Sequence, residues 1–415
     1  MAASPPRRLS LRQNFIWSFA GNALVNGAKW IMFIVLAKLA DERVVGDFSL
    51  ALAVATPLSA LAQMNLRLVL ITDTKDSHPF GVYHALRLLT TIVAVAASVA
   101  VALAVYGPGS RAVLILLVAT AQGVTALRDI WLGLAHKHER LDIPATGNAV
   151  EAAASTVLFC AALMATNSIH TAVAGIVAGR LGTLVIYDVP TVRDLVAQSR
   201  LAPDWRLSAL KQLFTTTLPL GVAVACISLN SNVPRYFIDG VLGENELAYF
   251  AAIAYFVLAG QMIVAALGRS ASPRLAALYT TERRAYGVLV IKMLLVAAVI
   301  GTAGVIGALL VGEIFLALAY TPEYAKHSHI LVLLMGAAAV SFLNTFLGVA
   351  ISAARFFKLQ STITAVLVAV TTLSSAVLIP RHGLDGAAWA TIIATCANLL
   401  MNGAVFFYVY RNQRP

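Results

Sequence analysis

The chain has 415 residues, of which 60% are hydrophobic and 12% charged, whereas a soluble domain carries about 45–50% apolar and roughly 25% charged residues. So little polar material cannot cover a water-facing globule, which excludes a soluble enzyme and a disordered chain. Lys and Arg total 30 against 19 Asp and Glu, a net charge of +11. Because membrane topology alone enriches basic loops, this charge does not by itself indicate a phosphate partner, and we expect no nucleic-acid partner.

Apolar runs of membrane length recur along the whole chain, and a transmembrane helix needs about 20 such residues. Strands of a barrel would instead alternate over roughly 10 residues. The first run is too long for a cleavable signal and lacks a small-residue cleavage site, so we expect none. The runs predict an all-α integral membrane protein with twelve transmembrane helices at about residues 14–40, 44–72, 85–106, 111–135, 145–166, 170–190, 213–234, 246–268, 287–311, 329–353, 359–379 and 385–410.

The distribution of basic residues predicts the orientation of these spans. With the N-terminus inside, 19 of the 30 Lys and Arg fall in inner segments, 5 in outer loops and 6 within spans. Arg87 is counted with the inner segments and Arg235 with the outer loops. Because inner loops collect Lys and Arg, this bias places both termini in the cytoplasm.

The longest interior loop separates two halves of six helices each. A weak internal repeat supports the division, since Phe48 precedes Arg67 by 19 residues and Phe250 precedes Arg269 by 19. Two such halves around a central cavity are typical of alternating-access transporters. The predicted domains are an N-terminal lobe at 1–190, a cytoplasmic linker at 191–212 and a C-terminal lobe at 213–415.

Four bases of the first half lie well inside predicted spans, where each costs at least ~2.5–3.5 kcal/mol unless it faces water, a counter-ion or a substrate. Structural alternatives stay open: Lys29 and Arg180 could form internal salt bridges, and Arg67 could simply follow the topology rule. Arg128 could pair with Asp129 or Glu151. The four bases are Lys29, Arg67, Arg128 and Arg180.

Helical spacing places polar residues on common faces of several spans. In the first span, Ser18, Asn22, Asn26 and Lys29 form one stripe. Neutral stripes follow in the second half, with interhelical packing as the structural alternative to ligand contact. We therefore predict a cationic interior in the first half and a mostly uncharged one in the second, with four asparagines lining the cavity: Asn22, Asn26, Asn398 and Asn402.

Several kinds of chemistry are missing from the sequence. It contains no Gly-rich loop followed by Lys-Ser/Thr, so we expect no direct ATP drive. Its three cysteines, Cys160, Cys226 and Cys396, lie in apolar runs without Cys-x-x-Cys spacing, so we expect neither metal nor cofactor. A basic intramembrane cavity without an energy-coupling domain favours transport of an anionic solute or lipid head group, such as a pyrophosphate-linked lipid.

Three stretches carry a resemblance to a known family. They lie at the second and third spans, after the fourth span, and in the seventh and eighth spans. The sequence here is similar to bacterial oligosaccharide flippases of the multidrug/oligosaccharidyl-lipid/polysaccharide exporter superfamily, over about residues 12 to 290. The stretches are NLRLVLITD at 65–73 with FGVY at 80–83, RDIWLGLAHKHERLD at 128–142, and SLNSNVPRYFI at 228–238 with ALGRSASPRL at 266–275.

The resemblance implies two six-helix lobes around a V-shaped cavity in the bacterial inner membrane. Such a flippase moves polyprenyl-pyrophosphate-linked oligosaccharides between leaflets by alternating access, for polysaccharides such as O-antigen, lipopolysaccharide or exopolysaccharide. Its partners would be the lipid-linked oligosaccharide, membrane lipids, a polysaccharide polymerase and chain-length machinery. The resemblance gives the pyrophosphate-holding role to Lys29, Arg67, Arg128 and Arg180, although relatives often have a neutral residue where Arg128 stands.

Two other functions compete with the flippase. A cation-coupled multidrug exporter of the same superfamily would prefer an acidic cavity, and the predicted interior offers only Asp129 and Glu151 against four bases. These two acids are the candidate proton carriers. A membrane-embedded glycan polymerase or acyltransferase would need larger exterior loops and an embedded His or carboxylate pair, so we expect no enzyme.

Overall fold

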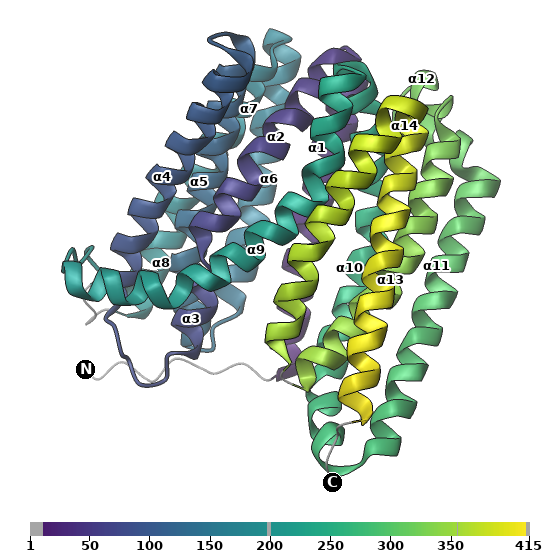
Figure 1. Ribbon diagram of the computed structural model, residues 1–415. Coiled ribbons are helices and arrows are strands. Elements are labelled where there is room, and N and C mark those ends of the chain that lie inside the picture. The colour runs from purple at the N-terminus through teal and green to yellow at the C-terminus, as the bar shows by residue number, and fades with distance from the viewer. Residues whose placement is uncertain (1–10, 197–200, 355, 412–415) are drawn as a thin grey trace. The chain divides into compact units, whose positions relative to one another are not determined.

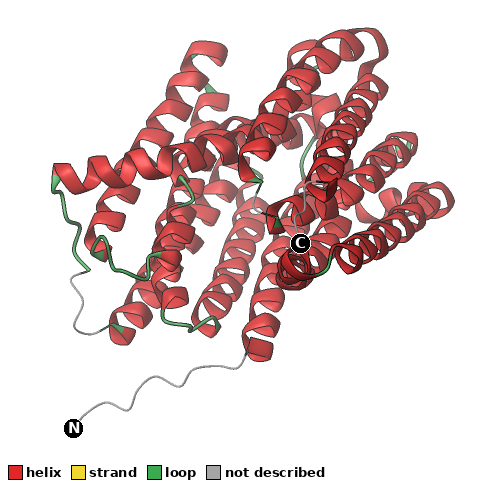
Figure 2. Ribbon diagram, turned by 60° about the horizontal axis from the view of Figure 1, so that its bottom comes forward, coloured by secondary structure: helices red, strands yellow, loops and turns green. Residues whose placement is uncertain are grey.

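The computed structural model describes residues 11–196, 201–354 and 356–411, and every regular element in these ranges is a helix (Figures 1 and 2). Ten helical segments within the described residues are long and apolar enough to cross a membrane. The predicted all-α architecture of a multi-pass membrane protein is therefore confirmed. The count of twelve spans and the cytoplasmic placement of both termini stay predictions.

The chain divides into two compact units. The chain passes from the first unit to the second inside α9 (Leu207–Val241), and the predicted lobes at 1–190 and 213–415 with the linker at 191–212 stay predictions. The cause is local packing, because Leu210 and Leu213 near the start of α9 belong to the hydrophobic core of the first unit. The first unit comprises Met1–Ala40 and Leu50–Ser228, and the second comprises Asp41–Ser49 and Leu229–Pro415.

The first unit is a bundle in which α1 packs on α6, α6 on α7, and α5 on both α4 and α7. Gly175 and Gly179, one turn apart on α7, let that helix approach α6 closely: an added Cβ would lie 2.7 Å from the carbonyl oxygen of Leu158 or 2.8 Å from the backbone of Ser155. Small residues at this spacing are typical of membrane helix seams. The elements are α1 (Leu11–Leu39), α2 (Glu42–Gln63), α3 (Leu66–Thr72), α4 (Phe80–Tyr106), α5 (Ser110–Lys137), α6 (Asp142–Thr166), α7 (Ile169–Thr183), the π-helical turn η1 (Leu184–Asp188) and α8 (Val189–Leu195).

The second predicted span is broken rather than continuous. Met64 and Asn65, between α2 and α3, have φ of 45° and 51°, in the left-handed region that non-glycine residues adopt rarely. The break takes the carbonyl of Gln63 out of the helical ladder, where it accepts a hydrogen bond from Arg87 Nη1 at 3.0 Å. It also starts a new helix one residue before Arg67, which places that side chain beside α5.

In the second unit, α13 packs on α10, α11 and α14 around a core that includes Tyr286, Phe342 and Phe346. α14 consists of two helical arms that meet at Gly383, whose φ of 59° and ψ of −135° are not helical. The two arms cover the spans predicted at 359–379 and 385–410. The elements are the last turns of α9, then α10 (Glu244–Thr281), α11 (Arg283–Ala319), α12 (Pro322–Ala325), α13 (Ser328–Ala353) and α14 (Phe357–Arg411).

Candidate functional site

The buried charges of the first unit gather around two adjacent residues of α5. Successive helical residues point about 100° apart, so the two side chains reach different neighbours. Arg128 meets residues of α6 and η1, and Arg180 on α7 joins them through Glu151, which gives the Arg128 cluster: Arg128, Glu151, Arg180 and Asp188. Asp129 meets α3 and α4, which gives the Asp129 cluster: Arg67, Arg87 and Asp129.

Arg128 is held most tightly by Asp188. Its Nε donates to Asp188 Oδ2 at 2.6 Å and its Nη2 to the carbonyl of Gly147 at 2.8 Å, and both side chains are almost fully buried. A side chain at Gly147 would block this pair, since an added Cβ would lie 2.5 Å from Asp188 Oδ1. The π-helical turn η1 ends at Asp188, and such turns are frequent at functional sites. Arg128 is therefore enclosed by its own partners.

Glu151 on α6 connects Arg128 to Arg180. Its Oε1 accepts from Arg180 Nε at 3.0 Å and from Ser155 Oγ at 3.3 Å, and its Oε2 lies 3.5 Å from Arg128 Nη1. Arg180 also donates to the carbonyl of Ala121 at 2.8 Å. Glu151 is the acid that neutralises Arg180, whereas Arg128 has Asp188 as well.

Lys29 on α1 completes the positive side of this region. Its side chain is exposed and forms no ion pair within the described part of the chain, although its charge interacts with those of Arg180 and Glu151. Lys29, Arg128 and Arg180 face two carboxylates, Glu151 and Asp188. The group therefore keeps one positive charge in excess, and Lys29 carries it at an accessible position.

The Asp129 cluster also holds one excess positive charge. Asp129 Oδ1 accepts from Arg67 Nη1 at 3.1 Å, and Asp129 Oδ2 accepts from Arg87 Nη2 at 3.4 Å. Arg87 is fully buried, while the side chains of Arg67 and Asp129 are 28% and 26% exposed. Half-buried His136 on the same face of α5 interacts electrostatically with Arg67. Arg67 is thus the accessible base of this cluster.

The structure brings together most of the predicted site residues and adds two that the sequence reasoning missed. Arg128 pairs with Glu151, one of its two predicted partners, but its shorter contact is to Asp188. The count of interior acids omitted Asp188, although it stands inside the predicted span 170–190 and could have been found there. Arg87, which was counted with the inner segments, lies in the second turn of α4 and is buried, and its side of the membrane stays a prediction.

Asparagines of the second unit form an uncharged network. Asn402 Nδ2 donates to Asn398 Oδ1 at 2.8 Å and to Asn344 Oδ1 at 3.4 Å, and Asn344 Nδ2 donates to the carbonyl of Thr395 at 2.9 Å. The two bonds of Asn344 join α13 to α14, whereas the bond between Asn402 and Asn398 lies within α14; the cavity-lining role of Asn398 and Asn402 stays a prediction. In the first unit Asn26 is half-buried, and the side chain of Asn22 lies outside the described residues.

Among the residues the structure describes, His, Cys, Asp and Glu never gather in a group of three that could hold a metal ion. The buried charges instead neutralise one another in pairs, apart from one excess cation in the Asp129 cluster and Lys29 beside the Arg128 cluster. This arrangement can hold an anion against Lys29 and Arg67 without a metal bridge.

A family model described as "Polysaccharide biosynthesis protein" matches residues 11–279 of the chain. The chain belongs to this family. A Staphylococcus aureus relative, "Capsular polysaccharide biosynthesis protein CapF", is 25% identical over 400 residues, which cover 96% of this chain and 99% of the relative. The matched residues contain both charged clusters.

Solved structures share the fold of this family member. The lipid II flippase MurJ in its inward closed conformation superposes with a TM-score of 0.76 at 12% identity, covering 96% of this chain and 90% of that one. A Vibrio cholerae MATE transporter, VcmN, gives a TM-score of 0.63 at 12% identity, covering 97% and 95%. The architecture is therefore common to a lipid flippase and a transporter of another kind, so the function has to be argued from the charged side chains.

Proposed function

We propose that the chain is a flippase that moves polyprenyl-pyrophosphate-linked oligosaccharides across the cytoplasmic membrane by alternating access. Family membership places it in polysaccharide biosynthesis, and its long apolar helices place it in a membrane. Sugars built on a lipid carrier at one leaflet and used at the other need such a protein, because the charged pyrophosphate cannot cross hydrocarbon unaided.

The observation that carries the proposal is the exposed, unpaired Lys29 beside the Arg180–Glu151 pair. A pyrophosphate needs at least two cationic contacts, and Arg can bind phosphate oxygens in a bidentate manner. Lys29 supplies one contact directly. Arg180, whose side chain is 13% exposed, supplies the other when the anion competes with Glu151 for its donors.

The other predicted phosphate ligands take different roles in this proposal. Arg128 is buried among Asp188, Glu151 and the carbonyl of Gly147, so it positions Glu151 and does not contact the substrate. Arg67 is accessible and serves as a further phosphate contact. Asp129 and Glu151 stay the candidate groups for coupling to protons.

The relative named above is a capsular polysaccharide protein, so we propose a capsular or other cell-surface glycan as the cargo. Asn398 and Asn402 are committed to packing through their amides. Any glycan contact in the second unit therefore falls to neighbouring exposed groups. A polymerase and chain-length machinery would receive the glycan on the outer side.

The multidrug exporter shares the fold, and charge distinguishes it from the flippase. A site for cationic drugs needs an excess of carboxylates, whereas the Asp129 cluster, and the Arg128 cluster together with Lys29, each carry an excess of one cation. A cation would be repelled there and an anion attracted. This balance supports the flippase.

The test is leaflet transfer of a labelled polyprenyl-pyrophosphate glycan by the full chain in liposomes. Lys29→Ala should lower the rate at least about tenfold, since one charge-assisted contact is worth about 1.5–3 kcal/mol. Lys29→Arg should retain most of the rate. The matched control is Lys137→Ala, which removes a cation of α5 that pairs with exposed Asp76 and should leave transfer unchanged. Wild-type rates from Lys29→Ala at normal protein levels would refute the site, and no transfer by the wild type would refute the function.

A further inference from the structure

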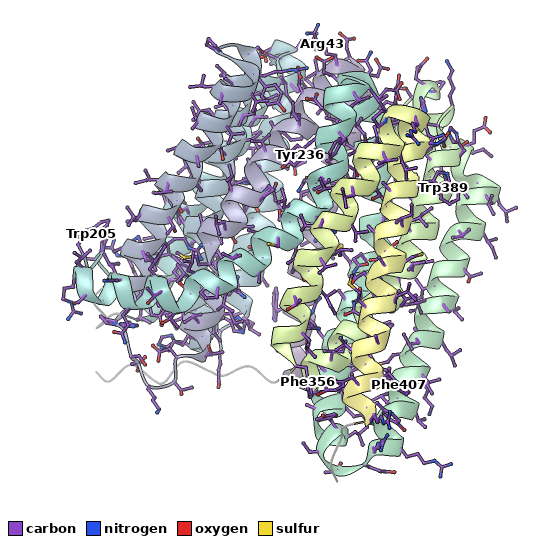
Figure 3. All side chains as sticks on the ribbon, in the orientation of Figure 1. Arg43, Trp205, Tyr236, Phe356, Trp389 and Phe407 are labelled. Atoms are coloured by element: carbon purple, nitrogen blue, oxygen red, sulfur yellow. The ribbon has the colours of Figure 1, made fainter. Side chains whose placement is uncertain are left out.

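An arginine of the second unit lies inside a long helix rather than beyond its end. Arg235 was expected in an outer loop, and that prediction is wrong because α9 continues to Val241. Arg235 is half-buried, and it follows Asn232 by one turn on the last third of the helix. Its neighbour Tyr236 marks this stretch in Figure 3.

The guanidinium of Arg235 points away from the end of α9. Nη1 donates to Oδ1 of Asn232 at 3.1 Å, and Asn232 stands nine residues before Val241, a rise of about 14 Å. Helical side chains tilt toward the N-terminus of their helix, which carries the head group in this same direction. An arginine that snorkels would extend toward the nearer helix end and its water, so Arg235 does not snorkel.

Neutral groups surround this guanidinium. Tyr236 on α9 and Tyr255 on α10 are the titratable groups that interact with it. Tyr255 stands eleven residues into α10, about 17 Å along that helix, so it reaches a similar depth. Within the described part of the chain Arg235 forms no ion pair. Its charge is therefore not cancelled as those of Arg128 and Arg180 are.

Most of the donors of Arg235 are unused. A guanidinium has five N–H donors, and the bond to Asn232 uses one of them. The nitrogens of Arg235 are not among the buried polar atoms that lack a partner, so they adjoin accessible space. An arginine at membrane depth that has no acidic partner faces a polar cavity, and its planar fork fits the two oxygens of a carboxylate or phosphate.

We propose that Arg235 is a second anion-binding group, which holds an oxyanion of the transported lipid-linked glycan. This proposal rests on the proposed function for the identity of the ligand. The oxyanion comes either from the pyrophosphate of the carrier or from the carboxylate of an acidic sugar. Asn232 fixes the guanidinium at depth, and Tyr236 and Tyr255 provide neutral walls that leave its charge available.

The first experiment needs no mutation and no transport. Detergent-purified full chain is treated with phenylglyoxal, which modifies accessible arginines, and the modified peptides are quantified by mass spectrometry with and without pyrophosphate or glucuronate. Arg235 should react, and a protecting anion at about four times its Kd should slow modification about fivefold. Exposed Arg274 should react without protection and buried Arg128 should not react.

The protecting anion identifies the source of the oxyanion. Protection by pyrophosphate alone assigns Arg235 to the carrier, and protection by glucuronate assigns it to an acidic sugar. An unreactive Arg235, or one that reacts equally with and without both anions, would overturn the proposal. Because the assay uses soluble anions, its result does not depend on whether the chain transports lipid.

Leaflet transfer then tests the same residue in function. Arg235→Gln should lower transfer about tenfold and Arg235→Lys less, since Lys keeps the charge but not the fork. A loss confined to acidic glycans supports the sugar carboxylate, and an equal loss for neutral glycans supports the pyrophosphate. Wild-type transfer of both by Arg235→Gln would contradict the proposal. Absence of transfer in the wild type would instead contradict the proposed flippase function.

Discussion

The two units contain similar helical bundles but bury their polar groups in opposite ways. The first unit places acids and bases of α3 to η1 in two ion-paired clusters. The second joins α13 and α14 through uncharged side-chain amides and a backbone carbonyl. Its embedded cation Arg235 has only neutral neighbours.

The difference has a physical consequence for ligand binding. An arginine that is paired with an acid loses most of its long-range electrostatic field. The charges of Arg128 and Arg180 are therefore largely unavailable to a substrate. Lys29 and Arg235 keep their charge because neither forms an ion pair with a carboxylate of the described residues. A count of embedded bases therefore overstates the charge available to a substrate, and the position of the acids decides which bases can bind.

The largest effect that tests this comparison is expected for Asp188→Asn. The change leaves Arg128 with Glu151 alone at 3.5 Å, and removing one partner of a buried pair costs about 3–5 kcal/mol. Thermal unfolding of the purified chain should show a clear fall in Tm. The control is Asp76→Asn, which breaks a pair whose acid is 80% exposed and should cost about 0–1 kcal/mol. Equal losses for both variants would show that burial adds nothing to the Arg128–Asp188 pair.

Glu151→Gln should lower the stability less than Asp188→Asn does, and it should strengthen anion binding. Arg128 keeps Asp188 and Arg180 keeps its bond to Ala121, so the fold survives. Glu151 competes with the anion for Arg180, and removing a repulsion of about 2 kcal/mol would raise the affinity about 30-fold. Competition binding with inorganic pyrophosphate measures this gain.

The control for Glu151→Gln is Ser155→Ala, which removes a hydrogen bond to the same carboxylate and keeps its charge. This variant should change the pyrophosphate affinity less than threefold, on the order of one weak hydrogen bond. Weaker pyrophosphate binding by Glu151→Gln than by the wild type would mean that Glu151 organises the site rather than competing for Arg180.

Much of the fold could be predicted because hydrophobic length is a local property. Each span needs only its own run of apolar residues, and the helices follow these runs. The break at Met64 and Asn65 was not predicted, because no Gly or Pro marks it in the sequence and Met64 lies in a core that also contains Leu210 and Leu213 from a distant helix. The unit boundary inside α9 has the same non-local origin.

The sequence was enough to predict which basic residues belong to the site. It was not enough to predict which acid pairs with which base. Burial in an apolar run was enough to select Lys29, Arg128 and Arg180. Which acid neutralises which base depends on how α6 and η1 approach α5, and Gly147 makes that approach possible. The ends of the helices were predicted less accurately than their cores. Arg87 was counted with an inner segment and Arg235 with an outer loop, whereas both residues lie inside helices, α4 and α9.

The smallest expected effect concerns the uncharged network. Asn402→Ala removes bonds to Asn398 and Asn344, and interhelical hydrogen bonds in membranes are worth roughly 0.6–2 kcal/mol. The matched control is Thr372→Ala, whose hydroxyl bonds only within its own helix, to the carbonyl of Val368 at 2.8 Å, and should change Tm less. If Asn402→Ala lowered Tm as much as Asp188→Asn, the two units would not differ in the cost of breaking their polar contacts. A smaller fall in Tm would mean that amides join the helices of the second unit without the penalty of an unpaired charge. The charge that a ligand can use in this unit is then that of Arg235.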